Sequence, residues 1–280
     1  MSHLLSSLGR DVVQADELLR HPKQNRLFID VRLGDPDEEF RSFRDCHIHG
    51  AVHAQIRDVF AATPTADSGN LPLPDIASLA ERLQAWRIDR DTELILYGPS
   101  LALAARGWWV LRWAGLDNVC VLDGGLKAWI AEGGAVAQGD GERSRHLPAS
   151  SLALRADGLP SISLSEVEAL PEQTTLIDAR DEASYLAGHI PRARHLAASQ
   201  LWTPSGRFRT VAELRRLYQD MGMAPGGVAV AYCGGGVLSA ATVLVLTALG
   251  WHPRLYVGSW SEWSRDGRRM ARSATAGAAA

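Results

Sequence analysis

The chain of 280 residues repeats itself, and this internal repeat limits the folds that it can adopt. Residues 27–32 (LFIDVR) correspond to residues 175–180 (TLIDAR), and residues 94–98 (LILYG) correspond to residues 229–233 (AVAYC). In both halves a glycine follows the second segment at the same spacing, at Gly115 and at Gly250. Two copies of one pattern predict two similarly folded domains.

Each half alternates short apolar runs with helical patterns, which predicts an α/β fold with a mostly parallel sheet flanked by helices in each domain. Capping-box spacing predicts helix starts at Ser165 with Glu168 and at Thr210 with Glu213. We expect an N-terminal domain over residues 1–136, a linker over 137–159 rich in Gly, Ser, Arg and Asp, and a C-terminal domain over 160–270. Residues 271–280 are small and polar, and we expect a flexible tail there.

Composition excludes several classes of function. The formal charge of −3 gives no broad electrostatic field, so we expect neither nucleic acid nor a membrane as partner. The first residues lack the pattern of a signal peptide, and the apolar run over residues 240–249 is too short to span a bilayer, so we expect a cytoplasmic protein. The three cysteines, Cys46, Cys120 and Cys233, have no metal-ligand spacing, and we expect no disulfide framework, metal or organic cofactor.

Cys233 is the candidate nucleophile. It follows an apolar strand pattern over residues 228–232 and precedes three glycines and a helical run over residues 238–249. This order predicts a loop at the carboxyl edge of the sheet, where open α/β folds bind ligands. Backbone N–H groups of such a loop and the N-terminal end of the helix favour an anion, here the reactive thiolate. We expect the anion-binding loop to consist of Gly234, Gly235, Gly236, Val237 and Leu238. The alternative is a buried cysteine that merely precedes a glycine turn.

These features resemble the tandem-domain rhodaneses, which are the thiosulfate and 3-mercaptopyruvate sulfurtransferases. The resemblance covers nearly the whole chain, and it includes the His-Ile turns at His47 and His189, the closure at residues 122–125 (LDGG) and residues 258–263 (GSWSEW). It implies two rhodanese-like α/β domains of which the C-terminal one is catalytic, because Gly98 stands in the first half where Cys233 stands in the second. We assign His47 and His189 structural roles, since the histidine also occurs in the half that is expected to be non-catalytic.

The resemblance implies a sulfurtransferase that carries sulfane sulfur as a Cys233 persulfide. A small-molecule donor, thiosulfate or 3-mercaptopyruvate, loads the cysteine, and cyanide or a thiol, with a thioredoxin-like reductant as a further candidate, removes the sulfur. The loop matches neither donor type fully. Gly234 and Gly235 stand where thiosulfate enzymes have cationic residues, and Gly235 stands where mercaptopyruvate enzymes have a serine. The sequence leaves the donor open.

An anionic donor requires cationic partners, and a guanidinium binds sulfonate or carboxylate through two hydrogen bonds. Arg180 is the first candidate because it matches the family's arginine after the Asp-x-Arg strand, although a structural pair with Asp178 is the alternative. Arg207 and Arg57 are weaker candidates.

Two other classes of function compete with the sulfurtransferase. A cysteine phosphatase of the same fold needs an arginine six residues after its cysteine, where this chain has Ser239. A sulfur relay or an anion-binding module without small-molecule turnover is the other alternative.

Overall fold

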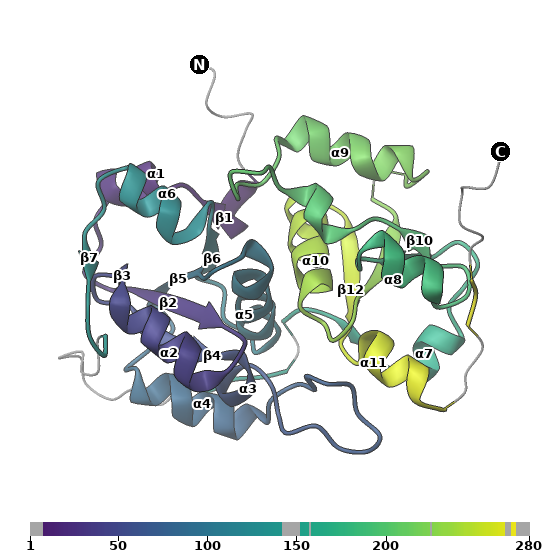
Figure 1. Cartoon of the computed structure of the whole chain (residues 1–280), viewed down its shortest axis with the longest axis horizontal. Helices are drawn as coiled ribbons and strands as arrows, with labels where there is room; N and C mark the ends of the chain where they lie inside the picture. Colours follow the sequence, from purple (N-terminus) through teal and green to yellow (C-terminus); the bar gives the residue numbers. More distant parts are fainter. Residues whose placement is uncertain (1–7, 142–151, 157, 225, 267–269, 273–280) are drawn as a thin grey trace.

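The computed structural model describes residues 8–141, 152–156, 158–224, 226–266 and 270–272. Two α/β domains lie side by side, with the first domain on the left of Figure 1 and the second on the right. The sequence prediction of two domains with parallel sheets is confirmed. Parts of the expected linker and tail, residues 142–151, 157 and 273–280, lie outside the described residues.

The first domain is built on a five-stranded parallel sheet in the order β1-β6-β5-β2-β4. Its strands are β1 (Val12–Val13), β2 (Arg26–Arg32), β4 (Val52–Gln55), β5 (Glu93–Tyr97) and β6 (Val119–Leu122). Its helices are α1 (Ala15–Arg20), α2 (Pro36–Asp45), α3 (Ile56–Val59), α4 (Ile76–Ala85), α5 (Leu101–Trp113) and α6 (Gly125–Ala131). Two further short strands, β3 (His47–Ile48) and β7 (Val136–Ala137), pair antiparallel with each other, so β7 spans the domain boundary expected after residue 136.

The second domain repeats this topology, with a parallel sheet in the order β8-β12-β11-β9-β10. Its strands are β8 (Ser161–Ile162), β9 (Thr175–Asp178), β10 (Arg194–His195), β11 (Val228–Tyr232) and β12 (His252–Tyr256). Its helices are α7 (Leu164–Glu168), α8 (Glu182–Ala187), α9 (Val211–Asp220), α10 (Leu238–Ala248) and α11 (Ser259–Trp263). Strand β11 occupies the place that β5 has in the first domain, so the ends of β5 and β11 are the equivalent positions of Gly98 and Cys233.

The sequence prediction is wrong for one of the two capping boxes. Thr210 and Glu213 form the box at the start of α9, as the spacing predicts. In α7, however, the box is formed by Ser163 and Glu166, because strand β8 ends at Ile162 and the chain turns into the helix at once. Ser165 and Glu168 lie inside α7.

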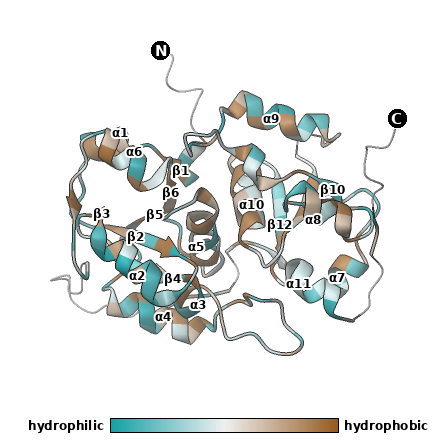
Figure 2. Cartoon of the chain, in the orientation of Figure 1, coloured by the Kyte–Doolittle hydropathy of each residue, from teal (hydrophilic) through white to brown (hydrophobic). Residues whose placement is uncertain are grey.

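The two domains share one hydrophobic core. Helices α5 and α10 pack against each other at the centre of the molecule, and one cluster of buried apolar side chains runs through both domains. Trp108 and Trp109 of α5 lie in this cluster together with Val243 and Leu244 of α10, and all four are essentially inaccessible to solvent. Outer helices such as α4 and α9 instead mix hydrophilic and hydrophobic residues, as Figure 2 shows. The shared core fixes each domain against the other.

Candidate active site

Cys233 directly follows β11, and the chain turns through three glycines into α10, as the sequence predicts. The thiol sulfur accepts a hydrogen bond from the backbone N–H of Gly236 at 3.1 Å and from the hydroxyl of Ser239 at 3.4 Å. Gly236 adopts a φ of 82°, a backbone conformation that L side chains rarely adopt. The loop therefore aims one amide at the sulfur, and the first turn of α10 adds a hydroxyl.

The loop is anchored to the segment that follows β12. The buried hydroxyl of Ser259 accepts the backbone N–H of Cys233 and donates to the carbonyl of Tyr256. Backbone N–H groups of Trp260 and Ser261 donate to the carbonyls of Cys233 and Gly234. Ser259 was missed by the sequence reasoning, although it lies in the segment 258–263 that carries part of the family resemblance. These bonds hold the cysteine backbone rigidly at the end of the sheet.

The first domain lies against the loop. The nearest atoms to a Cβ built on Gly235 belong to Asn70 and Leu71, at 3.7 and 4.0 Å. The segment that carries Asn70 is tied to the second domain, because the N–H of Asn70 donates to Ser261 and Arg265 donates to the carbonyls of Thr65 and Ala66. Cys233 itself is only 2% exposed, whereas Gly234 is exposed. A donor must therefore reach the sulfur across the surface of the glycine loop.

Arg180 is buried and held by an ion pair. Its guanidinium donates to both oxygens of Asp178, with the shortest distance 2.6 Å, and to the carbonyl of Gly188. It also stacks on the ring of Trp260, 4.4 Å from the centroid. Burial alone would lower the pKa of Arg180, but the hydrogen bond and the charge of Asp178 outweigh burial and raise this pKa. The guanidinium also lies over the ring of Tyr232, 5.9 Å from the centroid.

The same ion pair occurs in the first domain, where Arg32 donates to both oxygens of Asp30 at 3.0 Å. His47 and His189 are also equivalent, since each Nδ1 lies 2.9 Å from a carbonyl oxygen one helical turn earlier. A role confined to the cysteine site would not need these groups in both domains. The repetition supports structural roles for the histidines and for part of the contacts of Arg180.

Among the described residues, the two weaker cationic candidates form no hydrogen bond or ion pair with the loop. Arg207 donates to Gln14 of the first domain at 2.7 Å and lies 4.0 Å from Asp123. Arg57 is exposed on α3. The structure thus brings Arg180 into the surroundings of Cys233, through Trp260. Arg207 instead contacts residues of the first domain, and Arg57 is exposed on α3.

Arg106 was missed by the sequence reasoning. It lies in α5 of the first domain, is completely buried, and donates to the carbonyl of Gly236 in the cysteine loop. The signal in the sequence is one charged residue within the apolar run 101–111 (LALAARGWWVL), where every neighbour is suited to the core. Its partner, however, is more than a hundred residues away, and no local pattern identifies it.

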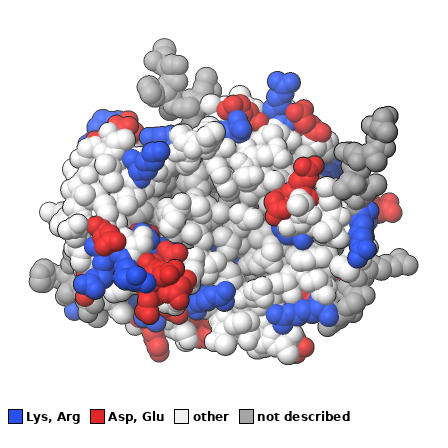
Figure 3. All heavy atoms as spheres, viewed as in Figure 1, with Lys and Arg blue, Asp and Glu red and all other residues white. Residues whose placement is uncertain are grey.

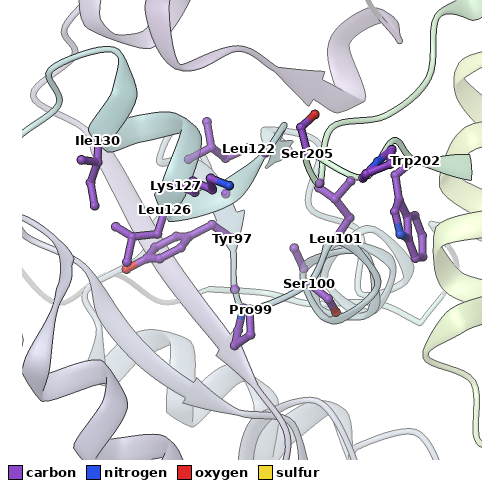
Figure 4. Close-up of a pocket in the computed structure, with 16 residues that line it drawn as sticks. Tyr97, Pro99, Ser100, Leu101, Leu122, Leu126, Lys127, Ile130, Trp202 and Ser205 are labelled. Atoms are coloured by element: carbon purple, nitrogen blue, oxygen red, sulfur yellow. The ribbon is translucent and has the colours of Figure 1, made fainter. Parts of the chain in front are cut away.

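The equivalent place in the first domain holds no nucleophile. A Cβ built on Gly98 would lie 2.3 Å from the carbonyl oxygen of Val31, so this backbone has no room for a cysteine. Beside Gly98 lies a hollow of about 600 Å³ between Tyr97, Lys127 and Trp202 (Figure 4). The hollow faces the second domain much as the cysteine loop faces the first. The difference between the two domains therefore lies in the backbone as well as in one side chain.

The described residues contain no group of three or more His, Cys, Asp or Glu side chains that could hold a metal ion. No helix in the described part of the chain is both long and apolar enough to cross a membrane. On the face shown in Figure 3, acidic and basic side chains lie interspersed around an uncharged centre.

Burial raises the pKa of Cys120 to about 12, which keeps this cysteine of the first domain in the thiol form.

Comparison with known proteins agrees with this site. The model of the rhodanese-like domain matches twice, over residues 14–132 and 163–266. The chain therefore belongs to the rhodanese-like domain family.

Two curated relatives match along most of their length. The "probable 3-mercaptopyruvate sulfurtransferase" of Pseudomonas aeruginosa is 38% identical over 261 residues, which cover 87% of this chain and 90% of the relative. The thiosulfate sulfurtransferase of Gallus gallus is 27% identical, with 92% and 94% covered. The crystal structure of SseA from Escherichia coli superposes with a TM-score of 0.77 and 27% identity, and the match covers 90% of this chain and 99% of SseA. The relatives carry the names of both donor types.

Proposed function

We propose that this protein is a sulfurtransferase that moves a sulfane sulfur from thiosulfate or 3-mercaptopyruvate to cyanide or a thiol through a persulfide on Cys233. The observation that carries the proposal is the convergence of the Gly236 N–H and the Ser239 hydroxyl on the sulfur of Cys233. Donors aimed at one sulfur stabilise negative charge there, as the thiolate and the persulfide both require.

The proposed reaction has two displacement steps. The Cys233 thiolate attacks the outer sulfur of thiosulfate, a new S–S bond forms, and the old S–S bond breaks as sulfite leaves with the electron pair. The product is a persulfide with one negative charge, the same charge that the thiolate carried. Cyanide then attacks the outer sulfur, thiocyanate leaves, and the thiolate returns. No charge is gained or lost at Cys233, so one set of donors serves both states.

A thiol acceptor performs the same second step and leaves as a persulfide. A thioredoxin-like protein is the macromolecular acceptor that we propose, because its thiolate would need only to approach the exposed Gly234 side of the loop. The cytoplasmic location expected from the sequence stays a prediction.

Donor binding is proposed to involve the guanidinium of Arg180, which lies over the ring of Trp260 beside the loop. Gly234 and Gly235 offer backbone instead of side chains, and nothing lies within 4 Å of a Cβ built on Gly234. An anionic donor above this loop therefore depends on charge from outside the loop. Arg207 and Arg57 would need to move away from their present positions to take part.

The position of Ser239 argues against the phosphatase alternative. A phosphatase of this fold would have an arginine there to bind phosphoryl oxygens, whereas the side chain of Ser239 is buried and donates to the cysteine sulfur. The loop over residues 233–238, all of which the structure describes, contains no cationic side chain that could replace this arginine.

Mass spectrometry of the intact protein tests the proposal. After incubation with thiosulfate or 3-mercaptopyruvate, the protein should gain the mass of one sulfur atom, and cyanide should remove it. Cys233→Ser should gain nothing, while the control Cys120→Ala should gain sulfur like the unaltered chain. The faster donor identifies the physiological type. Hydrolysis of an aryl phosphate without any sulfur gain would contradict the proposal and favour the phosphatase, and absence of both reactions would favour the anion-binding module.

A further inference from the structure

Arg106 is an unusual residue for its position. It lies in the middle of α5 and is 0% exposed. Helix α5 packs against α10 of the second domain (Figure 1). A fully buried guanidinium normally pairs with a carboxylate, because burying an isolated charge is costly. Among the described residues no carboxylate forms an ion pair with Arg106.

The hydrogen bonds of Arg106 go to backbone carbonyls of both domains. Nη2 donates to Phe60 at 3.2 Å and to Leu71 at 2.9 Å, both in the first domain, and Nη1 donates to Gly236 at 3.4 Å. Nε has no partner among the described residues. Carbonyl groups satisfy the N–H donors but do not neutralise the charge.

The contact with Gly236 connects Arg106 to the sulfur. Gly236 offers its carbonyl to Arg106 and its N–H to the sulfur of Cys233. A Cβ on Gly236 would lie 3.0 Å from Nη1 of Arg106, so a side chain there would push the two apart. One residue thus links the first domain's arginine to the second domain's cysteine.

The charge of Arg106 also connects this residue to Cys233. Burial lowers the pKa of Arg106 to about 10, and the negative charge of Cys233 acts against this fall. Arg106 is therefore still protonated near neutral pH. Among the described residues, the side chain that hydrogen-bonds to the sulfur is that of Ser239, whose hydroxyl carries no charge. The neighbouring ion pair of Arg180 with Asp178 is neutral as a whole. A buried cation that has no carboxylate partner among the described residues and the buried sulfur of Cys233 are thus both hydrogen-bonded to Gly236.

We propose that Arg106 is a positioning residue for sulfur transfer, which holds the Gly236 carbonyl and supplies the positive charge that balances the sulfur anion of Cys233. The inference rests on the proposed function, because it assigns a role in the same site. It gives the first domain, which has Gly98 in place of the candidate nucleophile, a part in the chemistry, since the charge that stabilises the thiolate and the persulfide comes from that domain.

The test measures how Cys233 reacts with iodoacetamide as a function of pH, in a chain with Cys46→Ser and Cys120→Ala so that one thiol reports. Arg106→Met should move the alkylation profile to higher pH by about one unit, and should slow sulfur loading from thiosulfate at pH 7 about tenfold. Arg106→Lys, which keeps the charge, should restore most of the reactivity. Arg112→Met is the matched control, because Arg112 lies on the same helix and pairs with exposed Asp117. It should leave the profile unchanged.

A folded Arg106→Met variant with an unchanged alkylation profile would overturn the inference. If Arg106→Met does not fold, Arg106→Gln removes the charge but keeps hydrogen-bond donors, and it is judged by the same profile. Alkylation needs no sulfur donor. A shifted profile together with no sulfur gain from any donor would therefore refute the proposed function while supporting the role of Arg106.

A second readout separates charge balance from simple packing. In a Cys233→Ser background no sulfur anion exists, so Arg106→Met should cost less stability there than in the presence of Cys233. Equal losses in both backgrounds would mean that Arg106 only packs the domain interface, and would also overturn the inference.

Discussion

The hydroxyl of Ser239 donates a hydrogen bond to the sulfur of Cys233 over 3.4 Å, and both residues are buried. Ser239 is the second residue of α10, so the helix that begins behind the glycine loop delivers a side-chain donor to the sulfur as well as its N-terminal end. The reactive sulfur thus accepts hydrogen bonds from a loop amide and a helix hydroxyl that belong to one continuous segment.

Removal of this hydroxyl should weaken the thiolate. We expect Ser239→Ala to lower the rate of sulfur loading about tenfold, because a hydrogen bond to a charged group contributes about 1.5 kcal/mol. The matched control is Thr242→Val, one turn further along α10, whose buried hydroxyl has no partner among the described residues. Thr242→Val should keep full activity and at least full stability. An equal loss of rate in both variants would point to disturbance of α10 instead.

Gly98 should tolerate no side chain. We expect Gly98→Ala to lower the free energy of unfolding by about 1–3 kcal/mol, because its Cβ would meet the carbonyl oxygen of Val31 at 2.3 Å. Gly234→Ala is the control, since nothing lies within 4 Å of its Cβ and its φ is not positive. Urea denaturation of both variants gives the comparison. Equal stability of the two would contradict the steric argument.

The ion pairs of the two domains allow the structural and substrate roles of Arg180 to be separated. Arg32→Met and Arg180→Met each leave a buried aspartate without its partner, and each should cost about 3–5 kcal/mol of stability. Arg180→Met alone should also raise KM for thiosulfate, because Arg180, unlike Arg32, lies in the domain that carries Cys233. Steady-state kinetics on the folded fraction measure this difference. An unchanged KM would make Arg180 purely structural.

Stability should fall in mild acid because of His53. Burial in the first place, and then the nearby charge of Arg32, lower the pKa of His53 from 6.5 to about 4. Between these values the unfolded chain binds a proton that the folded chain does not, so the stability from this group is complete above pH 6.5 and is lost toward pH 4. Denaturation at several pH values should show a smaller loss in His53→Leu. His252→Gln, at an exposed site, should keep the full pH dependence.

The sequence was most informative where local pattern and the internal repeat agreed. Strands β2, β5, β9 and β11 and helix α10 lie where the apolar runs predict them, and Gly115 and Gly250 both follow central helices with positive φ. The misplaced capping box has a simple cause. Ser163 with Glu166 and Ser165 with Glu168 share one spacing, and only the end of β8 decides between them.

The parts of the site that the sequence did not predict depend on contacts between distant segments. Arg106 and Gly236 meet because α5 packs on α10, and Ser259 reaches the cysteine backbone because β12 lies beside β11. Arg180 was predicted from resemblance, but its bonds to both oxygens of Asp178 became visible only in three dimensions. Periodicity describes one element at a time and contains no information on such pairs.

The steric contact at Gly98 has an evolutionary consequence. A glycine codon can become a cysteine codon by a single base change, so mutation alone could readily place a thiol at the position of Gly98. The Val31 carbonyl oxygen would lie 2.3 Å from the new Cβ. Each such mutant would therefore lose stability before it could gain any activity. A protein with two working sites would require the backbone to change first, and this keeps the two halves of the repeat in different roles.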